Sequence, residues 1–297
     1  MRAQGGSERA AGNTGRERLR RGPWLAALLL AAVGSAGAGG AERPAAPGFS
    51  LAELAVGAHR DPGNAERNRY RHPVETLEFF GLRPDSHVVE IWPAGGWYTE
   101  IIAPYVNERG QYYAAHWDPE SDSEFVRRAV ERFRAKLAAH PELYGNAKMT
   151  VLMPPDKWEM APEGSADLVL TFRNIHNWMP RGYAAEMFAA AYRALKPGGV
   201  LGVVEHRGDP DVPQDPKAAS GYVNEDYAIQ LAEAAGFVLE ARSEINANPA
   251  DTKDYEGGVW TLPPTLRKKD EDRAKYLAIG ESDRFTLRFR KPADGVR

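Results

Sequence analysis

Residues 87–100 contain the feature that most constrains the fold, a short apolar run that leads into a glycine-containing turn. The β-branched run from His87 to Glu90 predicts a buried strand, and Ala94-Gly95-Gly96 lets the backbone reverse within a few residues. From Trp97 to Tyr105 the chain can form a helix whose first N–H groups face the turn. The segment therefore predicts strand, turn and helix, which is either an ordinary connection or the seat of a small-molecule cofactor.

Glu90 stands at the end of the predicted strand, where its carboxylate could accept hydrogen bonds from ribose hydroxyls. No lysine follows the turn to meet phosphates, as a P-loop requires. The pattern therefore suits a nucleoside better than a nucleoside triphosphate.

Strand and helix patterns alternate from His87 onward, which is typical of a parallel sheet with helices on both faces. The first five strands are expected at 87–91, 111–115, 148–152, 167–172 and 200–205. Two more are expected at 237–245 and 285–290, and helices at 184–195 and 225–235. Ser121-x-x-Glu124 has the spacing of a capping box at the start of another helix. The sequence thus predicts one α/β domain over residues 50–292.

Two segments are additions to this alternating pattern. Residues 50–82 contain signals for short helices, with Pro73 suited to a first helical position, and are expected to form an N-terminal helical cover. Residues 246–283 are expected to be an excursion with a helix inside, between the last two strands. The loop at 207–224 leaves the carboxyl edge of the sheet and could act as a lid over a ligand.

A charged run at 60–72 lies within the helical cover. Its arginines include Arg67, Arg69 and Arg71. They could reach over a neighbouring pocket, but a solvated face is the simpler interpretation.

Residues 1–38 have the layout of a secretory signal peptide. Arginines precede an apolar run at 24–33, and Ala36-Gly37-Ala38 offers a cleavage site. The run is too short to span a bilayer comfortably, so cleavage is favoured over a permanent anchor, although an uncleaved anchor or a misassigned start are alternatives. Arg20-Arg21 is a weak twin-arginine signal. We expect a linker at 39–49 and a periplasmic or secreted protein with no stable membrane anchor after cleavage.

Composition excludes several classes of site and partner. The sequence has no cysteine, so disulfides, thiolate metal sites and a cysteine nucleophile are excluded. Without residues 1–38 the chain has 32 basic and 39 acidic side chains, a net charge of −7. Nucleic acid is therefore an unexpected partner. The sequence does not indicate an oligomeric state.

The order of the elements resembles that of class I S-adenosylmethionine-dependent methyltransferases. More closely, three segments are similar to a little-characterised bacterial branch of predicted methyltransferases that often have signal peptides. They are Glu90-Ile91-Trp92-Pro93, Thr171-Phe172-Arg173-Asn174-Ile175-His176-Asn177-Trp178 and Asp283-Arg284-Phe285. The resemblance implies a Rossmann-like sheet of strand order 3-2-1-4-5-7-6 with the last strand antiparallel. It also implies S-adenosylmethionine as cofactor, lying across the carboxyl ends of strands 1 and 2.

The cofactor residues implied by the resemblance begin in the first turn. They are Glu90, Ala94, Gly95 and Gly96, beside the amino-acid part and ribose of the cofactor. The family usually has glycine where Trp92 and Ala94 stand, so two of three expected glycines are replaced.

A second difference from the family follows strand 2. His116 occupies the place of the acid that usually binds the ribose hydroxyls, and Asp118 follows two residues later. Either residue could reach the ribose. Asp118 could equally cap the turn before Pro119.

Four side chains that follow strand 4 would face a substrate next to the methyl donor. Arg173 could bind an acidic group, and Asn174 could orient the lone pair of a nucleophile. His176 could accept the nucleophile's proton, and Trp178 could contact the sulfonium by a cation–π interaction. Alternatively, His176 satisfies a buried carbonyl and fixes the loop.

Strand 5 ends at Glu205-His206-Arg207, an acid, a base and a cation facing the same crevice. His206 is a candidate catalytic residue, and Arg207 a candidate substrate-binding residue. No metal site is predicted, because His176 and His206 lie on different elements without a local ligand spacing.

The sequence as a whole favours an enzyme that transfers a methyl group from S-adenosylmethionine to a small or medium-sized acceptor. The main alternative is an exported, non-catalytic binding protein that retains the methyltransferase fold. A nicotinamide oxidoreductase is disfavoured because the G-x-G-x-x-G spacing is absent.

Overall fold

The structure is a computed structural model that describes residues 48–293. The predicted signal peptide (1–38) and nearly all of the predicted linker (39–49) lie outside the described residues, so both stay predictions. No helix in the described part combines the length and apolar character needed to cross a membrane.

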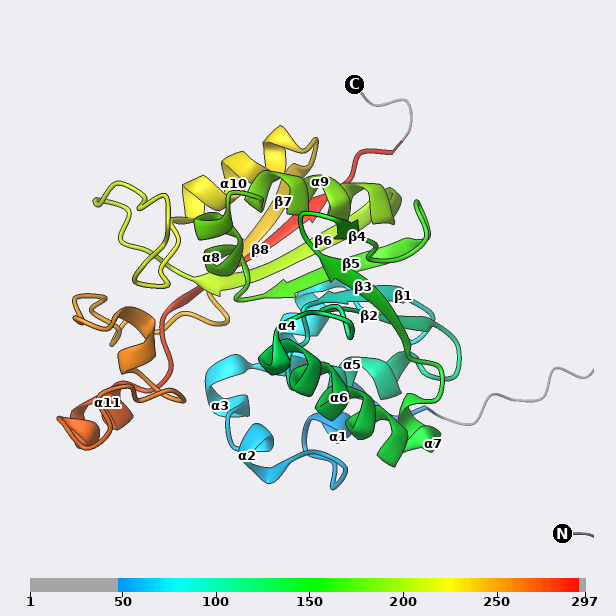
Figure 1. The fold of residues 1–297 in the computed structure, drawn as a ribbon, viewed down its shortest axis with the longest axis horizontal. Helices are drawn as coiled ribbons and strands as arrows, with labels where there is room; N and C mark the ends of the chain where they lie inside the picture. The colour runs from blue at the N-terminus through cyan, green and yellow to red at the C-terminus, as the bar shows by residue number, and fades with distance from the viewer. Residues whose placement is uncertain (1–47, 294–297) are drawn as a thin grey trace, which may run out of the picture. The chain divides into compact units, whose positions relative to one another are not determined.

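One eight-stranded sheet organises residues 48–293 (Figure 1). Its strands are β1 (His87–Ile91), β2 (Gln111–His116), β3 (Lys148–Met153), β4 (Lys157–Trp158), β5 (Ala166–Phe172), β6 (Leu195–His206), β7 (Val238–Ser243) and β8 (Arg284–Arg290). The order is β4-β3-β2-β1-β5-β6-β8-β7. β8 is antiparallel to both β6 and β7, whereas β1, β2, β3, β5 and β6 pair in parallel. The predicted α/β sheet with its 3-2-1-4-5-7-6 order is confirmed, with β4 as a short extra edge strand.

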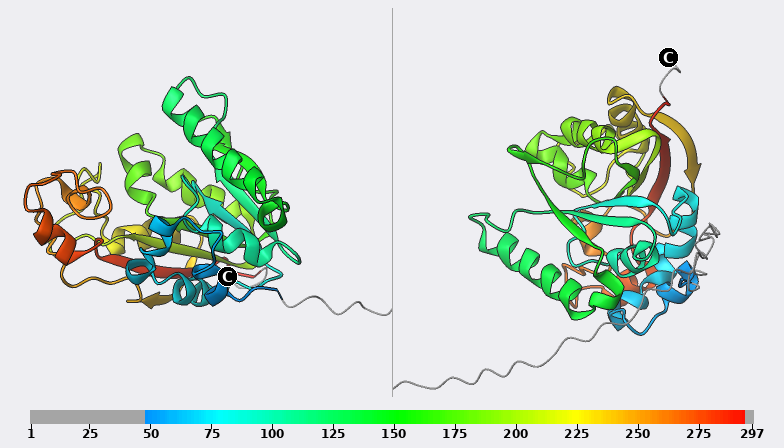
Figure 2. Two further views of the ribbon diagram at one scale, coloured as in Figure 1. Left: turned by 90° about the horizontal axis from the view of Figure 1, so that it is seen from below. Right: turned by 90° about the vertical axis from the view of Figure 1, so that its right-hand side faces the viewer.

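Helices cover both faces of the sheet (Figure 2). They are α1 (Leu51–Ala55), α2 (Pro62–Ala65), α3 (Asn68–Arg71), α4 (Pro73–Phe80), α5 (Thr99–Val106), α6 (Glu124–Ala139), α7 (Pro141–Tyr144), α8 (Ile175–Trp178), α9 (Ala184–Ala194), α10 (Glu225–Ala234) and α11 (Arg273–Ile279). Two 3-10 turns are η1 (Met179–Arg181) and η2 (Gly258–Thr261).

Two apolar cores lie on opposite faces of the sheet because neighbouring residues of a strand point to opposite sides. Val88 packs with α1, α4, α5 and Phe133 of α6. Val89 packs with α8, α9 and α10. Apolar side chains pack on both faces of the central strands, so these strands are buried on both sides, as expected for a parallel sheet.

Two local predictions were wrong. α6 begins after Ser123, with no capping hydrogen bond from that side chain, so Ser121 and Glu124 do not form a capping box. A capping box forms instead between Ser50 and Glu53 at the start of α1. The strand predicted at 200–205 begins earlier, because β6 starts at Leu195 and its Gly198 and Gly199 hydrogen-bond through the backbone to Lys291, just after β8.

The turn after β1 adopts an unusual backbone. Trp92 has φ 45°, Ala94 has φ 52° and Gly96 has φ 82°, so all three positions where the resembled family has glycine are left-handed. A non-glycine residue in this region costs roughly 1–2 kcal/mol. Trp92 offsets part of this cost, because its indole N–H donates to the carbonyl of Leu152 (2.9 Å) and its ring packs on Trp117 and Trp178.

Candidate functional site

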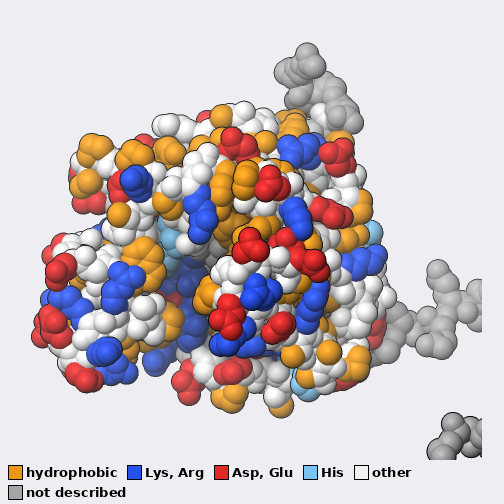
Figure 3. All heavy atoms as spheres, in the orientation of Figure 1, with side chains coloured by type: hydrophobic (Ala, Val, Ile, Leu, Met, Phe, Trp, Pro, Cys, Tyr) orange, Lys and Arg blue, Asp and Glu red, His pale blue; other side chains and the backbone are white. Residues whose placement is uncertain are grey.

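A cavity of about 800 Å³ opens where β1, β5 and β6 end and β8 begins. Figure 3 shows the hollow on one face, with Lys or Arg atoms in its depth and a His atom at its edge. The excursion at 246–283 lines it through Val259, Trp260 and Ser282 among others. The loop at 207–224 contributes no lining residue, so the predicted lid was placed on the wrong segment.

Glu90 lies on one wall of the cavity and is 3% exposed. Its Oε2 accepts hydrogen bonds from Thr99 Oγ1 (2.8 Å) and Tyr112 OH (2.7 Å). Its Oε1 has no hydrogen-bond partner among residues 48–293 and is left for a ligand. Burial raises the pKa of Glu90 to about 7, although the two hydroxyl hydrogen bonds oppose that rise.

Only one of the other cofactor residues predicted in this turn lines the cavity. Ala94 lines the cavity, whereas Gly95 and Gly96 do not. Gly96 has a structural role, since its left-handed backbone favours glycine and an added Cβ would lie 3.2 Å from Phe133.

His116 and Asp118 do not line the cavity, so the ribose-binding roles suggested for them are not supported. His116 Nδ1 accepts from the backbone N–H of Trp117 (2.8 Å), and its Nε2 lies 3.2 Å from the carbonyl of Ala94. Burial lowers the pKa of His116 to about 4, so the ring is neutral and fixes the turn. Asp118 accepts from the backbone of Glu120 and from Lys157 (2.6 Å), which is the turn-capping alternative.

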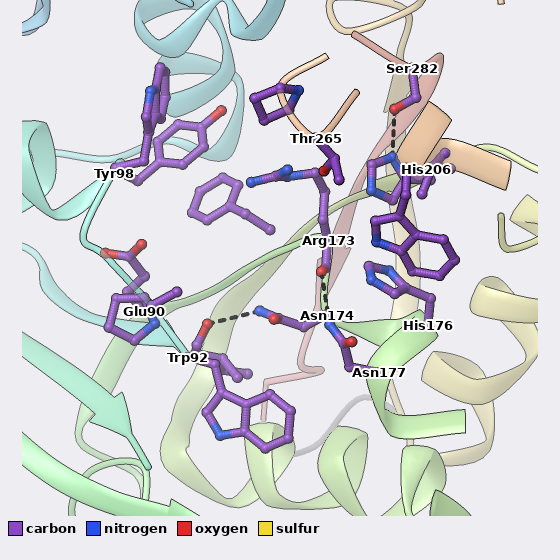
Figure 4. Close-up of a pocket in the computed structure, with 18 of the residues that line it drawn as sticks. Glu90, Trp92, Tyr98, Arg173, Asn174, His176, Asn177, His206, Thr265 and Ser282 are labelled. Carbon is purple, nitrogen blue, oxygen red and sulfur yellow. Dashed lines mark hydrogen bonds between the residues drawn. The ribbon is translucent and has the colours of Figure 1, made fainter. Parts of the chain in front are cut away.

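His176 and His206 face the cavity together, opposite Glu90 and Tyr98 (Figure 4). Their ring centroids are 5.3 Å apart. His176 Nδ1 lies 3.0 Å from Glu205 Oε1, so the carboxylate fixes Nδ1 as the protonated nitrogen and leaves the Nε2 lone pair available. His206 Nδ1 pairs with Ser282 Oγ. Burial, together with His176 and Arg173, holds the pKa of His206 well below its usual value, so that ring is neutral.

The side chains of His176, Glu205 and His206 bring potential metal-ligand atoms within 4.8 Å of one another, a grouping that the sequence did not predict. The carboxylate of Glu205 already accepts from the backbone N–H groups of Ile175 (2.6 Å) and His206 (2.9 Å) as well as from the His176 ring. The guanidinium of Arg173 also faces this cavity. Since a nearby guanidinium disfavours a second cation and Glu205 is saturated, the group is better suited to proton transfer than to metal binding.

Asn174 lines the cavity and is 7% exposed. Its Nδ2 donates to the carbonyl of Ile91 (2.9 Å) and to Thr171 Oγ1 (3.3 Å), which ties the end of β5 to the end of β1. Its carbonyl oxygen has no partner among the described residues, so it can accept a hydrogen bond from a ligand.

Two predicted substrate-binding residues point away from the cavity. Trp178 is 1% exposed and packs on Trp92 and Phe188 in the core. Arg207 pairs with Glu244 and Asp283. Neither lines the cavity, so both assignments are corrected.

Sequence reasoning missed several lining residues. Among them are Arg71, Trp117, Trp260, Glu281 and Arg284. Arg71 is only 2% exposed, so the interpretation of 60–72 as a solvated face was wrong for this residue. Two signals were available. The arginines of 60–72 had the alternative of reaching over a neighbouring pocket, and the similarity at Asp283-Arg284-Phe285 had no role assigned to it.

Comparison with known proteins defines the class of the fold. No protein-family model and no curated protein matches this sequence. Among solved structures, a SAM-dependent methyltransferase from Aquifex aeolicus aligns with a TM-score of 0.51 and 16% identity, over 82% of this chain and 99% of that chain. The [4+2]-cyclase SpnF aligns with a TM-score of 0.51 and 14% identity, over 75% of this chain and 80% of that one.

The described domain therefore has the class I methyltransferase fold. A protein named as a cyclase shares this fold, so the fold alone does not define the reaction. The reaction therefore has to be inferred from the residues that line the cavity.

The buried carboxyl of Glu90 gives a prediction on stability. Its pKa rises from the ordinary 4.5 to about 7 on folding, so the folded protein binds this proton more tightly than the unfolded chain. Its contribution to stability is complete below the unfolded value and is lost as the pH rises through about 7, by on the order of 3 kcal/mol. We expect the free energy of unfolding of wild type, relative to Glu90→Gln, to fall between about pH 5 and pH 8 in urea titrations.

The comparison with Glu90→Gln is needed because His116, whose pKa is lowered on folding, makes the free energy of unfolding rise with pH in both proteins. A constant difference across this range would show that Glu90 does not titrate as its burial requires.

Proposed function

We propose that the cavity binds S-adenosylmethionine and that the protein transfers its methyl group to a small or medium-sized acceptor. The observation that supports this most directly is that two opposite walls of the cavity each present a free acceptor atom. Glu90 offers a free carboxylate oxygen on one side, and His176, oriented by Glu205, offers a free lone pair on the other (Figure 4).

The residues of the β1 side fit a nucleoside cofactor. Glu90 Oε1 can accept from a ribose hydroxyl or an ammonium group, and the left-handed turn at 92–96 brings backbone close to the cavity through Trp92 and Ala94. Tyr98 and Trp117 add aromatic surface. Aromatic faces attract both a flat base and a cation such as a sulfonium.

When bound, S-adenosylmethionine supplies a methyl group that is activated by its sulfonium and open to in-line attack. The protein has to hold the acceptor in line and remove its proton where the nucleophile is not already anionic. His176 Nε2 can accept that proton, and the carboxylate of Glu205, 3.0 Å from Nδ1, stabilises the resulting imidazolium. The free carbonyl oxygen of Asn174 can orient the acceptor's donor group.

Replacement of His176 tests this role. We expect His176→Gln to lower kcat by about 100-fold to 10,000-fold while the affinity for S-adenosylhomocysteine stays within a factor of about two. Acceptors would be found by incubating the full chain with methyl-deuterated cofactor and a bacterial metabolite extract, with mass spectrometry of labelled products.

His140→Gln is the matched control, because that histidine side chain is exposed, away from the cavity, and its loss should leave kcat unchanged. Equal kcat for His176→Gln and wild type would exclude His176 as the base. Cofactor binding without any labelled product would favour the non-catalytic binding protein.

We also propose that the protein is exported and cleaved after Ala38, on the basis of the arginine-rich start, apolar run and small residues that precede it. An exported methyltransferase would need the cofactor to be supplied in its compartment. The full chain would be expressed in a bacterial host that exports proteins, and its N-terminus sequenced. We expect a chain that starts at Gly39. An intact N-terminus in the cytosolic fraction would contradict export.

A further inference from the structure

Four guanidinium groups gather around one carboxylate on the cationic side of the cavity. Arg67 Nε donates to Glu281 Oε1 (2.6 Å), and Arg71 Nε donates to Oε2 (2.9 Å). Arg284 Nη2 also donates to Glu281 Oε2. Arg173 lies in the same electrostatic environment, because Arg284, Glu281 and Arg67 all affect its pKa. We call Arg67, Arg71, Arg173 and Arg284 with Glu281 the arginine cluster.

The arginine cluster contains N–H donors that have no hydrogen-bond partner in the described part of the chain. Arg71 Nη2 and Arg284 Nε are buried without a hydrogen-bond partner, and both side chains are only 2% exposed. Arg173 makes no side-chain hydrogen bond or ion pair with any residue in 48–293, and its guanidinium extends across the cavity (Figure 4). Buried polar groups are normally paired, which favours a partner for these donors that residues 48–293 do not supply.

The charges of the cluster do not balance. Glu281 offsets one of four positive charges, and Glu205, the next carboxylate that acts on Arg173, is occupied by His176 and backbone N–H groups. Burial would raise the pKa of Glu281, but the four guanidiniums outweigh it and hold that pKa well below its usual value. Burial and Arg284 lower the pKa of Arg173 to about 10, which still leaves it charged near neutral pH. The surplus of positive charge favours an anion.

The cluster is adjacent to the histidine pair rather than to a separate pocket. Arg71, Arg173, Arg284, His176 and His206 all line one cavity, and the three arginines lower the pKa of His206. Figure 3 places Lys or Arg atoms deep in the hollow beside a His. An anionic group bound there would hold the rest of its molecule within reach of the histidines.

Part of the remaining lining of the cavity is flat and apolar. Phe172 stacks on Tyr98 with centroids 3.6 Å apart, and Trp260 lies edge-on to His176 at 6.1 Å. Pro263 and Pro264 continue this surface. These residues suit a planar or apolar body attached to the anionic group.

We propose that the acceptor is a small oxyanion, a carboxylate or a phosphate on an apolar or aromatic body, and that Arg173 with the free donors of Arg71 and Arg284 binds its anionic group. This inference deepens the proposed methyl transfer and rests on it for the role of the bound molecule. Guanidinium groups are well suited to both anions because they can donate two parallel hydrogen bonds to two oxygens.

The test is calorimetric titration of the full chain saturated with S-adenosylhomocysteine. Benzoate, its neutral analogue benzamide, and inorganic phosphate are the probes. We expect benzoate or phosphate to bind at least tenfold more tightly than benzamide, and the stronger anion shows whether carboxylate or phosphate is preferred. Arg173→Met should weaken that anion at least tenfold and leave S-adenosylhomocysteine affinity within about threefold. Arg69→Met is the matched control, since Arg69 is exposed and does not line the cavity.

Equal binding of benzoate and benzamide by wild type, or no binding of either anion, would overturn the inference without any variant having to fold. A loss of S-adenosylhomocysteine affinity in Arg173→Met with anion binding unchanged would also overturn it, because the arginines would then hold the cofactor's own carboxylate. If S-adenosylhomocysteine fails to bind while the anion still binds in an Arg173-dependent way, the anion site stands and methyl transfer fails.

Discussion

The ion pairs of Glu281 hold the functional cavity together. This one carboxylate joins Arg67 and Arg71, which precede the sheet in sequence, to Arg284 at the start of β8. Without it, several buried guanidiniums would lie close together without compensation, which is strongly destabilising. The N-terminal helices and the start of the last strand therefore form one cationic wall, although more than 200 residues of chain separate Arg71 from Glu281.

A second buried carboxylate organises the opposite half of the chemistry. Glu205 accepts hydrogen bonds from the first backbone N–H of α8, from the backbone of His206 and from the ring of His176. The same contacts fix the short helix after β5 and turn Nδ1 of His176 toward the carboxylate. The cavity thus has three differently built parts. They are a carboxyl with a free oxygen at Glu90, a histidine pair whose rings contact Glu205 and Ser282, and an arginine cluster held by Glu281.

The sequence predicted well what depends on local pattern. β1 was predicted at its observed bounds, and the strand order followed from the resemblance. Glu90, Asn174, His176 and His206 were predicted as site residues and all line the cavity. It was harder to predict which of several neighbouring residues lines the cavity. His206 lines the cavity, whereas Arg207 next to it pairs with Glu244 and Asp283, and Trp178 packs in the core with Ile175.

The arginine cluster could not be derived from local pattern. Its members come from α3, the end of β5 and the start of β8, and only folding brings these three segments together. Arg71 is in a charged run that reads as a solvated surface, because sequence alone does not show that Glu281 is its partner. The altered turn is a similar case. Trp92 and Ala94 stand where the resembled family has glycine, yet both adopt a left-handed backbone, which glycine favours.

Proton release on binding tests most directly whether Glu90 receives a nucleoside cofactor in this cavity. Titration of the full chain with S-adenosylhomocysteine near pH 7, in two buffers of different ionisation enthalpy, measures both affinity and protons exchanged. Because the pKa of Glu90 is raised to about 7, hydrogen bonds from the ligand to its carboxylate should displace a fraction of a proton per site. We expect binding with proton release in wild type and binding without release in Glu90→Gln. No binding, or binding of wild type with no proton released, would contradict it.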